Sequence, residues 1–498
     1  MDVRKALIEA AKIYKERVVF IYEDKESSFL ELKEKSLKLA NALLNLGIKK
    51  GDSVAIYLPN CPEYIYSYLA IYCLGAVAVP LDFFLQLDEI VNMLSHCEAR
   101  MIISTKEARF DIQDLTERIS TLKDILLIEE NFWDLVKESS PELREQGLKE
   151  EDYSSIFYTS GVTGKPKGVL WNRRHLNLGI DCVNHFLKMD SHFRAIAAVP
   201  FSHSAGPLFP MGAIKYGMSF VIMKRFSPLE FARLVERYKV TICWLVPPMY
   251  LAILNLKELE KYDLSSIRWA DVFGAPSNPE IIKKFKKYFP NGYMLNGWGM
   301  TETAPPTVVS DPDDVKPVGK VGPYAEIKIF DPCDKEVAIG QIGEVVIRGE
   351  AVCVGYYKEP ELNSEVMRNG WFHTGDLGKF DKQGNLYIVG KIKDMIKVAG
   401  EIVFSPEIEE VLLNHPCVAE AAVIGVEDRL RGEVPKAFVV LKEGINIPEK
   451  HLIYFCKEHI AHFKIPRYIE FRSFLPKTGP QKIDKARLKK EEIERRKK

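Results

Sequence analysis

The sequence predicts an α/β protein with a large N-terminal domain of layered α/β sheets, a small β-barrel-like part and a small α+β domain at its end. Apolar strands alternate with helices through the first part of the chain, which is typical of parallel sheets in layers. From residue 318 short strands are separated by glycine turns, which favours antiparallel pairing. Beyond residue 393 the chain has its own order of helices and strands. We therefore predict two domains, 1–392 and 393–498.

The first layered elements follow from apolar spacing. Residues 29–46 have the period of a helix, and Gly47 stands where a helix usually ends. Further strands are predicted at residues 53–58, 99–104 and 125–128.

One stretch, residues 64–81, contains no charged residue and is a candidate membrane span. It is barely long enough to span a bilayer, and Gly75 and Pro80 interrupt it. We predict a buried helix to residue 74 and a buried strand at 76–80, and no transmembrane segment.

Three later strands each end in proline or glycine. They are predicted at residues 195–199, 241–246 and 268–273, with another strand at 218–223. Such ends favour loops that converge on one edge of a sheet, where α/β proteins form their sites. Residues 200–210, PFSHSAGPLFP, are too rich in proline, glycine and aromatic residues for regular structure.

The second half is predicted to contain antiparallel strands at 326–330, 344–348 and 385–389, and a domain boundary at 391–394. In the last domain we predict helices at 407–413 and 449–459, strands at 418–426 and 437–442, and a solvated charged helix at 485–498.

Composition excludes several classes of protein. The 498 residues include 69 basic and 69 acidic side chains, so bulk charge gives no sign of a nucleic-acid partner. Nine scattered cysteines without a CxxC pair argue against a disulfide framework and a cysteine zinc site, and favour the cytoplasm. The first residues form a charged amphipathic helix without the apolar core of a signal peptide.

The stretch 158–169, YTSGVTGKPKGV, follows a short buried strand and suits a phosphate. Its glycines let backbone N–H groups approach an anion closely. Hydroxyl donors and positive charge come from Thr159, Ser160, Thr163, Lys165 and Lys167. A Walker loop is excluded, because Lys165 is followed by Pro166 and the two preceding glycines are too close together. A flexible surface loop is the alternative for such a stretch taken alone.

Other candidate residues are weaker one by one. In NGWGMTET, Glu302 could hold a divalent cation, Thr301 could bond an anion and Trp298 could stack on a base, although a Trp–Gly pair is often packing only. In WFHTGDL, Asp376 is predicted in a tight turn, where it could take ribose hydroxyls or simply cap the turn. His203 has no second histidine at metal spacing, so we predict a residue of a pocket wall.

Together, four stretches resemble the adenylate-forming superfamily of acyl-CoA synthetases, firefly-luciferase-like enzymes and peptide-synthetase adenylation domains. They occur in the order YTSGVTGKPKGV, NGWGMTET, WFHTGDL and GKIKDMIKVAGEIVFSPEIEE, and the resemblance extends over essentially the whole chain. It implies a mobile C-terminal domain and two half-reactions. A carboxylate attacks the α-phosphate of MgATP and expels pyrophosphate, and the thiol of coenzyme A then displaces AMP.

The resemblance also implies roles for particular positions. The β- and γ-phosphates would lie against Thr159, Ser160, Gly161, Thr163, Gly164, Lys165 and Lys167, and the adenine against Gly274, Ala275, Pro276 and Trp298. Asp376 would take the ribose, with Lys391 near the ribose or phosphate. The catalytic and tunnel positions would be Glu302 for Mg²⁺, Thr301 for the α-phosphate, Lys482 as a bridge between the reacting carboxylate and the phosphate, Lys393 as the hinge and Gly400 in the pantetheine tunnel.

Three positions depart from the family's pattern. Val162 replaces a threonine, Lys391 replaces an arginine, so that a fork becomes a point charge, and Gln481 replaces a glycine before Lys482. None removes an essential charge, so we predict an active enzyme. A non-catalytic relative that only binds nucleotide or acyl groups is the alternative, and the retained Glu302, Asp376 and Lys482 argue against it.

The acid is predicted from the pocket residues. Gly299 stands where acetate-specific members of the family carry a bulky aromatic residue, so the pocket should extend. Its apolar walls are predicted from Phe201, Phe209, Trp244 and Val272. His203 or Arg194 could serve a polar or aromatic acid. We predict a medium- to long-chain fatty acid, with an aryl or short branched acid as the alternative, and a homodimer is common in such proteins.

Overall fold

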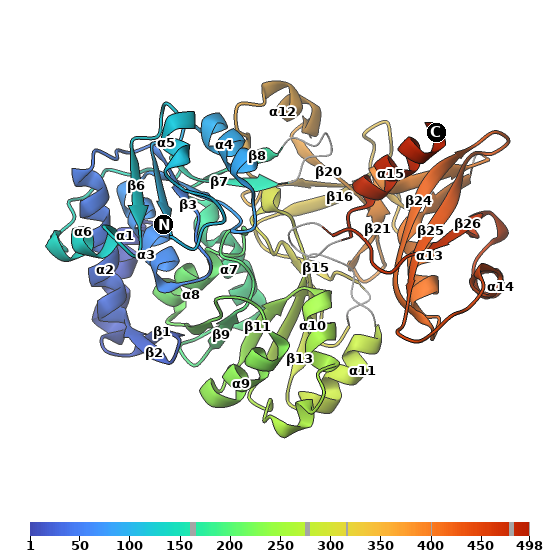
Figure 1. Ribbon diagram of the computed structural model, residues 1–498, viewed down its shortest axis with the longest axis horizontal. Coiled ribbons are helices and arrows are strands. Elements are labelled where there is room, and N and C mark those ends of the chain that lie inside the picture. Colours follow the sequence, from blue (N-terminus) through green and yellow to red (C-terminus); the bar gives the residue numbers. More distant parts are fainter. Residues whose placement is uncertain (160–165, 274–278, 315–316, 400, 478–482, 498) are drawn as a thin grey trace. The chain divides into compact units, whose positions relative to one another are not determined.

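The computed structural model describes residues 1–159, 166–273, 279–314, 317–399, 401–477 and 483–497 (Figure 1). It forms two compact units, Met1–Glu326 with Arg348–Phe372, and Ile327–Ile347 with His373–Lys498. Within the described ranges no helix is long and apolar enough to cross a membrane. The nine cysteines are all free thiols.

The first unit contains two sheets. In one of them the described strands pair in the order β15 (Lys320–Val321), β14 (Val308–Val309), β13 (Tyr293–Trp298), β12 (Trp269–Phe273), β11 (Ile242–Leu245), β9 (Arg194–Ala197), β10 (Ser219–Ile222), β1 (Val18–Tyr22) and β2 (Lys25–Ser28). The strands from β13 to β1 are parallel. The ends of β9, β11 and β12 therefore meet at one edge, which confirms the prediction made from their proline and glycine residues.

The second sheet of this unit has a mixed order. Its described strands are β18 (Gly355–Tyr356), β8 (Lys167–Asn172), β7 (Tyr153–Thr159), β4 (Val77–Pro80), β3 (Ser53–Ile56), β5 (Met101–Ser104) and β6 (Asp124–Leu127). Only the pairs of β8 with β7 and β18 are antiparallel. The four strands predicted between residues 53 and 128 are confirmed.

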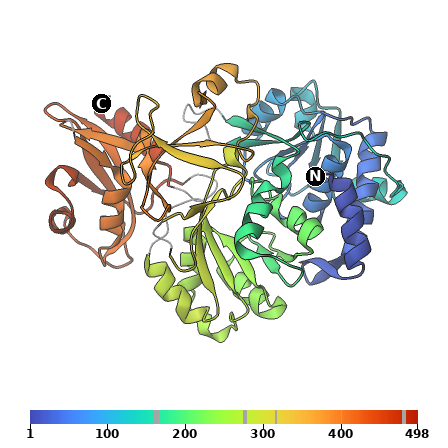
Figure 2. The same cartoon turned by 180° about the vertical axis from the view of Figure 1, so that it is seen from behind.

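Helices separate and cover the two sheets, as Figures 1 and 2 show from opposite sides. The outer face of the first sheet packs against α9 (Pro228–Tyr238), α10 (Pro247–Leu254) and α11 (Pro279–Tyr288). The shared core between the sheets contains α1 (Val3–Tyr14), α2 (Phe29–Asn45), α3 (Pro62–Leu74), α6 (Phe132–Glu138), α7 (His175–Leu187) and α8 (Leu208–Tyr216). The outer face of the second sheet packs against α4 (Leu87–His96) and α5 (Asp114–Arg118). Helix α12 (Pro360–Val366) follows β18.

Local chemistry fixes the ends of the predicted helices. Helix α2 begins with a reciprocal cap, in which the Glu31 N–H donates to Ser28 Oγ at 3.2 Å and the Ser28 N–H donates to the Glu31 carboxylate at 3.0 Å. Helix α3 ends at Gly75, whose φ of 73° lies in the left-handed region that glycine adopts at low cost. The uncharged stretch is thus a buried helix followed by a buried strand, as predicted.

The second unit contains most of one antiparallel sheet and a separate α+β part. The antiparallel sheet has the order β16 (Glu326–Phe330), β17 (Gly343–Arg348), β20 (Trp371–Phe380) and β19 (Met367–Arg368). Strand β21 (Leu386–Lys391) also pairs with β20. The sheet of the α+β part has the order β23 (Glu401–Phe404), β22 (Met395–Val398), β25 (Gly432–Leu441) and β24 (Val418–Asp428), and β26 (Tyr468–Phe471) also pairs with β25. Its helices are α13 (Ser405–Leu413), α14 (Glu449–His459) and α15 (Lys485–Lys497).

One prediction for this unit is wrong. Helix α15 is not solvated on all sides, because Leu488 is fully buried among apolar residues of β24 and β25. The Glu492 carboxylate also pairs with Lys436 Nζ at 2.7 Å. One buried apolar side chain and one largely buried ion pair therefore dock this largely charged helix.

Candidate functional site

The two ends of the predicted phosphate loop lie side by side in the second sheet of the first unit. Thr159 is the last residue of β7 and pairs with Lys167, the first residue of β8. The strands are held close behind the loop, because a Cβ on Gly168 would lie 2.8 Å from Ile156 Cγ2. The predicted residues Ser160, Gly161, Val162, Thr163, Gly164 and Lys165 lie outside the described residues.

Thr301 and Glu302 lie in a single 3₁₀ turn, η2 (Thr301–Thr303), just after β13. The main chain of this turn is held by strand β8 and by the segment just before β18. Trp171 Nε1 donates to the Thr301 carbonyl at 2.8 Å, and the Cys353 N–H donates to the Glu302 carbonyl at 2.8 Å. The Thr301 and Glu302 side chains are half-buried, so they remain partly open to solvent.

Tyr356 connects this turn with the predicted phosphate loop. Its hydroxyl donates to Glu302 Oε1 at 2.8 Å, and Lys167 Nζ lies 5.3 Å from the centre of its ring. Burial, and then the charge of Glu302, raise the pKa of Tyr356 above its usual range, so it stays a neutral donor. Sequence reasoning missed Tyr356, whose signal is only an aromatic residue in a two-residue strand.

Glu302 is suited to bind one divalent cation together with a ligand's phosphates. No group of three His, Cys, Asp or Glu side chains arranged for a metal occurs among the described residues. Mg²⁺ is usually held by one or two carboxylates plus substrate phosphates. A lone carboxylate beside a lysine-flanked loop fits that pattern.

The predicted irregular segment at 200–210 meets this turn. Ser204 Oγ lies 3.4 Å from Thr301 Oγ1, which also places the neighbouring His203 close to the turn. His203 is half-buried, which suits the predicted wall position. Gly206 allows the tight bend, because a Cβ there would lie 2.1 Å from the Phe201 carbonyl oxygen.

Trp298 and Gly299 close the end of β13. Trp298 is 9% exposed, and its carbonyl accepts from the Thr307 N–H at 2.8 Å. The space above Gly299 is occupied rather than open, because a Cβ there would lie 2.8 Å from Pro305 Cβ and 3.1 Å from Thr307 Oγ1. Gly274, Ala275 and Pro276, the predicted adenine contacts, lie outside the described residues.

Three of the four predicted pocket walls lie together. The ring of Phe209 lies 5.6 Å from that of Phe201 and 5.4 Å from that of Trp244, on the face of the first sheet that looks toward α8. Val272 is not part of this group. It lies on the opposite face, in the core that packs against α9 to α11, because neighbouring residues of a strand point to opposite sides.

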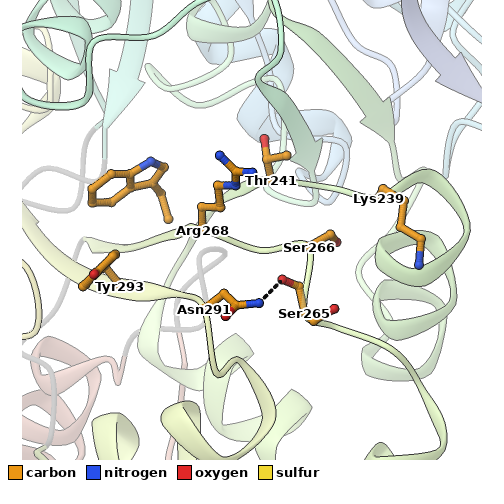
Figure 3. A pocket seen from close by; sticks show the side chains of 8 residues that line it. Lys239, Thr241, Ser265, Ser266, Arg268, Asn291 and Tyr293 are labelled. Carbon is orange, nitrogen blue, oxygen red and sulfur yellow. Dashed lines mark hydrogen bonds between the residues drawn. The ribbon is translucent and has the colours of Figure 1, made fainter.

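Arg194 is also excluded from the wall. As the first residue of β9 it lies at the opposite ends of the parallel strands, where its guanidinium donates to Ser219 Oγ at 3.2 Å and to the Tyr238 carbonyl at 2.6 Å. The same edge carries a cavity of about 640 Å³ (Figure 3), lined by Lys239, Thr241, Ser265, Ser266, Arg268, Trp269, Asn291 and Tyr293. None of the predicted site residues is among those that line it.

In the second unit, Asp376 and Lys391 face each other across β20 and β21 and form an ion pair. Asp376 is 5% exposed and Lys391 is exposed. Asp376 lies within β20 and not in a tight turn as predicted. The preceding Gly375 has a φ of 69°, and this single left-handed residue bends the strand without ending it.

Lys393 lies directly after β21 in a short 3₁₀ turn, η3 (Ile392–Asp394). Its side chain is exposed, and its carbonyl accepts from Lys489 Nζ of α15 at 3.0 Å. Gly400, Gln481 and Lys482 lie outside the described residues.

Comparison with known proteins gives two family matches. Residues 7–357 match the AMP-binding enzyme family, and residues 407–482 match the AMP-binding enzyme C-terminal domain.

Individual relatives are similar over most of their length. The chain is 34% identical to a feruloyl-CoA synthase of Amycolatopsis sp over 472 residues, 93% of each chain. It is 30% identical to a long-chain-fatty-acid–CoA ligase of Bacillus subtilis (strain 168), over 98% of this chain and 94% of that protein. Among solved structures, an anthranilate CoA ligase, AuaEII, in complex with anthranoyl-AMP superimposes with a TM-score of 0.91 at 28% identity, over 99% of this chain and 97% of that one.

Proposed function

The chain belongs to the AMP-binding enzyme family, in the acyl-CoA synthetase branch of the adenylate-forming superfamily, and from that premise we propose that it activates an aryl carboxylic acid. It is an ATP-dependent acid–thiol ligase that joins an acid to coenzyme A through an acyl adenylate. ATP, Mg²⁺ and coenzyme A are its cosubstrates and metal. The identity of the acid and the roles of single residues are the proposal.

The observation that carries the proposed site is the hydrogen bond from the Tyr356 hydroxyl to Glu302. Tyr356 binds the Glu302 carboxylate through its hydroxyl, and the Lys167 ammonium group lies near its ring. The anionic Glu302 and the cationic Lys167 therefore lie on either side of one tyrosine side chain. A triphosphate with its metal needs both signs of charge in such an arrangement. When bound, Mg²⁺ neutralises negative charge on the phosphates. We assign Glu302 to the metal, and Lys167 and Thr159 to the phosphates.

Thr301 is assigned to the α-phosphate, next to the reacting carboxylate of the acid, and His203 to the wall of the acid's pocket. The Thr301 hydroxyl is adjacent to Ser204, and His203 precedes that serine, so a carboxylate at this point would meet hydroxyl donors on two elements. In the second unit, Asp376 with Lys391 is assigned to the ribose, and Lys393 to the hinge. Lys482 is assigned, from its motif alone, to bridge the reacting carboxylate and the α-phosphate.

An aryl acid is favoured over a fatty acid by two observations. The first is the similarity to a feruloyl-CoA synthase over nearly the whole of both chains. The second is the packing of Phe201, Phe209 and Trp244 on one another, together with the filled space above Gly299, which suits a compact acid more than a long chain. The similarity to a long-chain-fatty-acid–CoA ligase makes a fatty acid the second candidate.

Thioester formation with two matched series of acids tests the substrate. The enzyme is supplied with MgATP, coenzyme A and either benzoates and cinnamates or straight-chain acids of increasing length, and the acyl-CoA products are separated and measured. We expect kcat/KM for the best aryl acid to exceed that for every straight-chain acid by at least about tenfold, about 1.4 kcal/mol. A maximum among the long straight-chain acids would instead support the fatty-acid candidate.

We also propose a cytoplasmic location, supported by nine thiols without a disulfide. We propose a homodimer because homodimers are frequent in the family, and light scattering of the purified protein tests this oligomeric state.

A further inference from the structure

Two buried polar atoms on neighbouring strands of the first sheet have no hydrogen-bond partner among the described residues. One is Oδ1 of Asp271 on β12, a side chain that is 4% exposed. The other is Nε1 of Trp244 on β11, a side chain that is 2% exposed. Buried polar groups are nearly always paired, because an unpaired one loses its hydrogen bonds to water without replacement. An acceptor and a donor left open side by side therefore point to a missing third group.

The register of the sheet puts both side chains on one face. Trp244 and Asp271 are direct neighbours across the parallel pair β11–β12, whose backbones lie about 4.8 Å apart. This is the face on which Phe209 contacts Trp244. On the next strand Gly297 makes room for the carboxyl group, since a Cβ there would lie 3.0 Å from Asp271 Oδ1.

Among the described residues no positive charge is paired with the buried carboxyl group of Asp271. The described titratable groups that interact with it electrostatically are Cys182 of α7, Cys243 of β11 and Tyr250 of α10. The pKa values of these three groups are raised, so all are neutral near pH 7. Among the described residues, Asp271 forms no ion pair or side-chain hydrogen bond of its own. The packing of the sheet thus holds the Asp271 carboxyl group in place without giving its Oδ1 atom a hydrogen-bond partner.

Both groups lie below the edge of the sheet where the candidate site forms. Asp271 stands two residues before the end of β12 at Phe273, and Trp244 one residue before the end of β11. At about 3.3 Å per residue, Asp271 is about 7 Å below that edge. A benzene ring with a short spacer covers such a depth when the carboxylate of the acid is held at the edge.

We propose that Asp271 and Trp244 bind a hydroxyl group at the far end of the substrate, so that the enzyme selects a hydroxyaryl acid. This inference rests on the proposed function. The hydroxyl oxygen accepts from Trp244 Nε1, and the hydroxyl hydrogen is donated to Asp271 Oδ1. A methyl group would leave both protein atoms unpaired. An ammonium group would leave the indole N–H unpaired.

Matched pairs of acids that differ by one hydroxyl test the proposal. Acyl-CoA formation is measured for 4-hydroxycinnamate against cinnamate, and for 4-hydroxyphenylpropanoate against phenylpropanoate. A buried polar atom of the protein that is left without its hydrogen-bond partner by the acid lacking the hydroxyl corresponds to a preference of about 5- to 150-fold in kcat/KM for the hydroxylated acid. We expect the wild type to show it. We expect Asp271→Leu to abolish it, losing rate on the hydroxylated acid and gaining rate on its partner.

Trp244→Phe is the second variant, because it keeps an aromatic ring and removes only the N–H donor. It should lower the preference by about five- to tenfold. Met294→Leu is the matched control. Met294 is fully buried on the opposite face of β13, and a swap of similar volume there should leave the preference unchanged.

The outcomes separate this inference from the proposed function. Equal rates of the wild type on both members of each pair, or an undiminished preference in Asp271→Leu and Trp244→Phe, would overturn the inference and leave the aryl-CoA ligase in place. If the wild type forms no aryl thioester, the proposed function fails. Calorimetric binding of the same pairs then decides the inference, which requires tighter binding of the hydroxylated acid by the wild type alone.

Discussion

Replacing Asp271 by leucine should stabilise the protein, and the gain should grow with pH. Burial raises the pKa of Asp271 to about 8 from its ordinary value of 3.8. In the unfolded chain the group loses its proton near pH 4, whereas in the folded chain it keeps the proton until about pH 8. Between these values the folded state binds more protons, so the free energy of unfolding falls as pH rises. Leucine does not titrate, so this loss of stability with pH is absent from Asp271→Leu.

The size of the effect follows from the two pKa values. Each pH unit within that window lowers the free energy of unfolding by about 1.4 kcal/mol. From pH 5 to pH 8 the stability of the wild type should therefore fall behind that of Asp271→Leu by up to roughly 4 kcal/mol. Below pH 4 both states carry the proton, and the difference should be independent of pH.

Urea unfolding at pH 5, 6.5 and 8, followed by tryptophan fluorescence, measures this difference. Other titrating groups are shared by the two proteins and cancel when the variant is compared with the wild type. Met294→Leu, on the opposite face, should differ from the wild type by the same amount at every pH. A constant difference for Asp271→Leu as well, or a difference that shrinks as pH rises, would refute a buried carboxyl group without a partner.

Three further predictions concern the reaction. Glu302→Ala should lower the rate of acyl-adenylate formation by about 10²-fold or more and shift its Mg²⁺ dependence to higher concentration, because the proposed metal ligand is lost; an unchanged Mg²⁺ titration would make Glu302 structural only. Tyr356→Phe keeps the ring beside Lys167 but removes the donor to Glu302, and should raise the KM for MgATP by about tenfold with little change in the KM for the acid; equal changes in both would indicate general misfolding. Lys393→Pro fixes φ near −65° at the proposed hinge and should block thioester formation from supplied acyl adenylate while pyrophosphate release persists. Lys393→Ala is the control and should retain both steps. Loss of both steps in a folded Lys393→Pro enzyme would contradict the hinge assignment.

Much of the fold was readable from the sequence where local signals are strong. The capping box at Ser28 and Glu31 and the glycine after α3 mark helix ends without help from the rest of the chain. Proline or glycine after β9, β11 and β12 marked the edge at which these parallel strands end.

Side-chain direction in buried strands was not readable. Parallel strands covered on both faces have continuous apolar runs, so the sequence carries no alternation from which a face could be assigned. For that reason Val272 was grouped with Trp244, although they lie on opposite faces. The same limit hid Asp271, whose place beside Trp244 depends on register between strands.

The candidate site was predicted as motifs but not as contacts. The motifs identified Glu302, Thr301 and Lys167 because their residue types and order are distinctive. The contact through Tyr356 joins residues more than fifty positions apart in the chain, and no local pattern reports such a pair. The tight turn predicted at Asp376 is wrong for a related reason. Glycine often marks the end of a strand, but Gly375 only bends β20, which continues to Phe380.

The central claim, that the chain activates an acid as its adenylate, is tested most directly by pyrophosphate exchange. Labelled pyrophosphate is incubated with the enzyme, MgATP and an aryl acid without coenzyme A, and label in ATP is counted. We predict exchange that requires the acid and proceeds without coenzyme A, since the first half-reaction is reversible and complete in itself. Absence of exchange together with formation of ADP and phosphate would contradict the claim, because the acid would then be activated as an acyl phosphate.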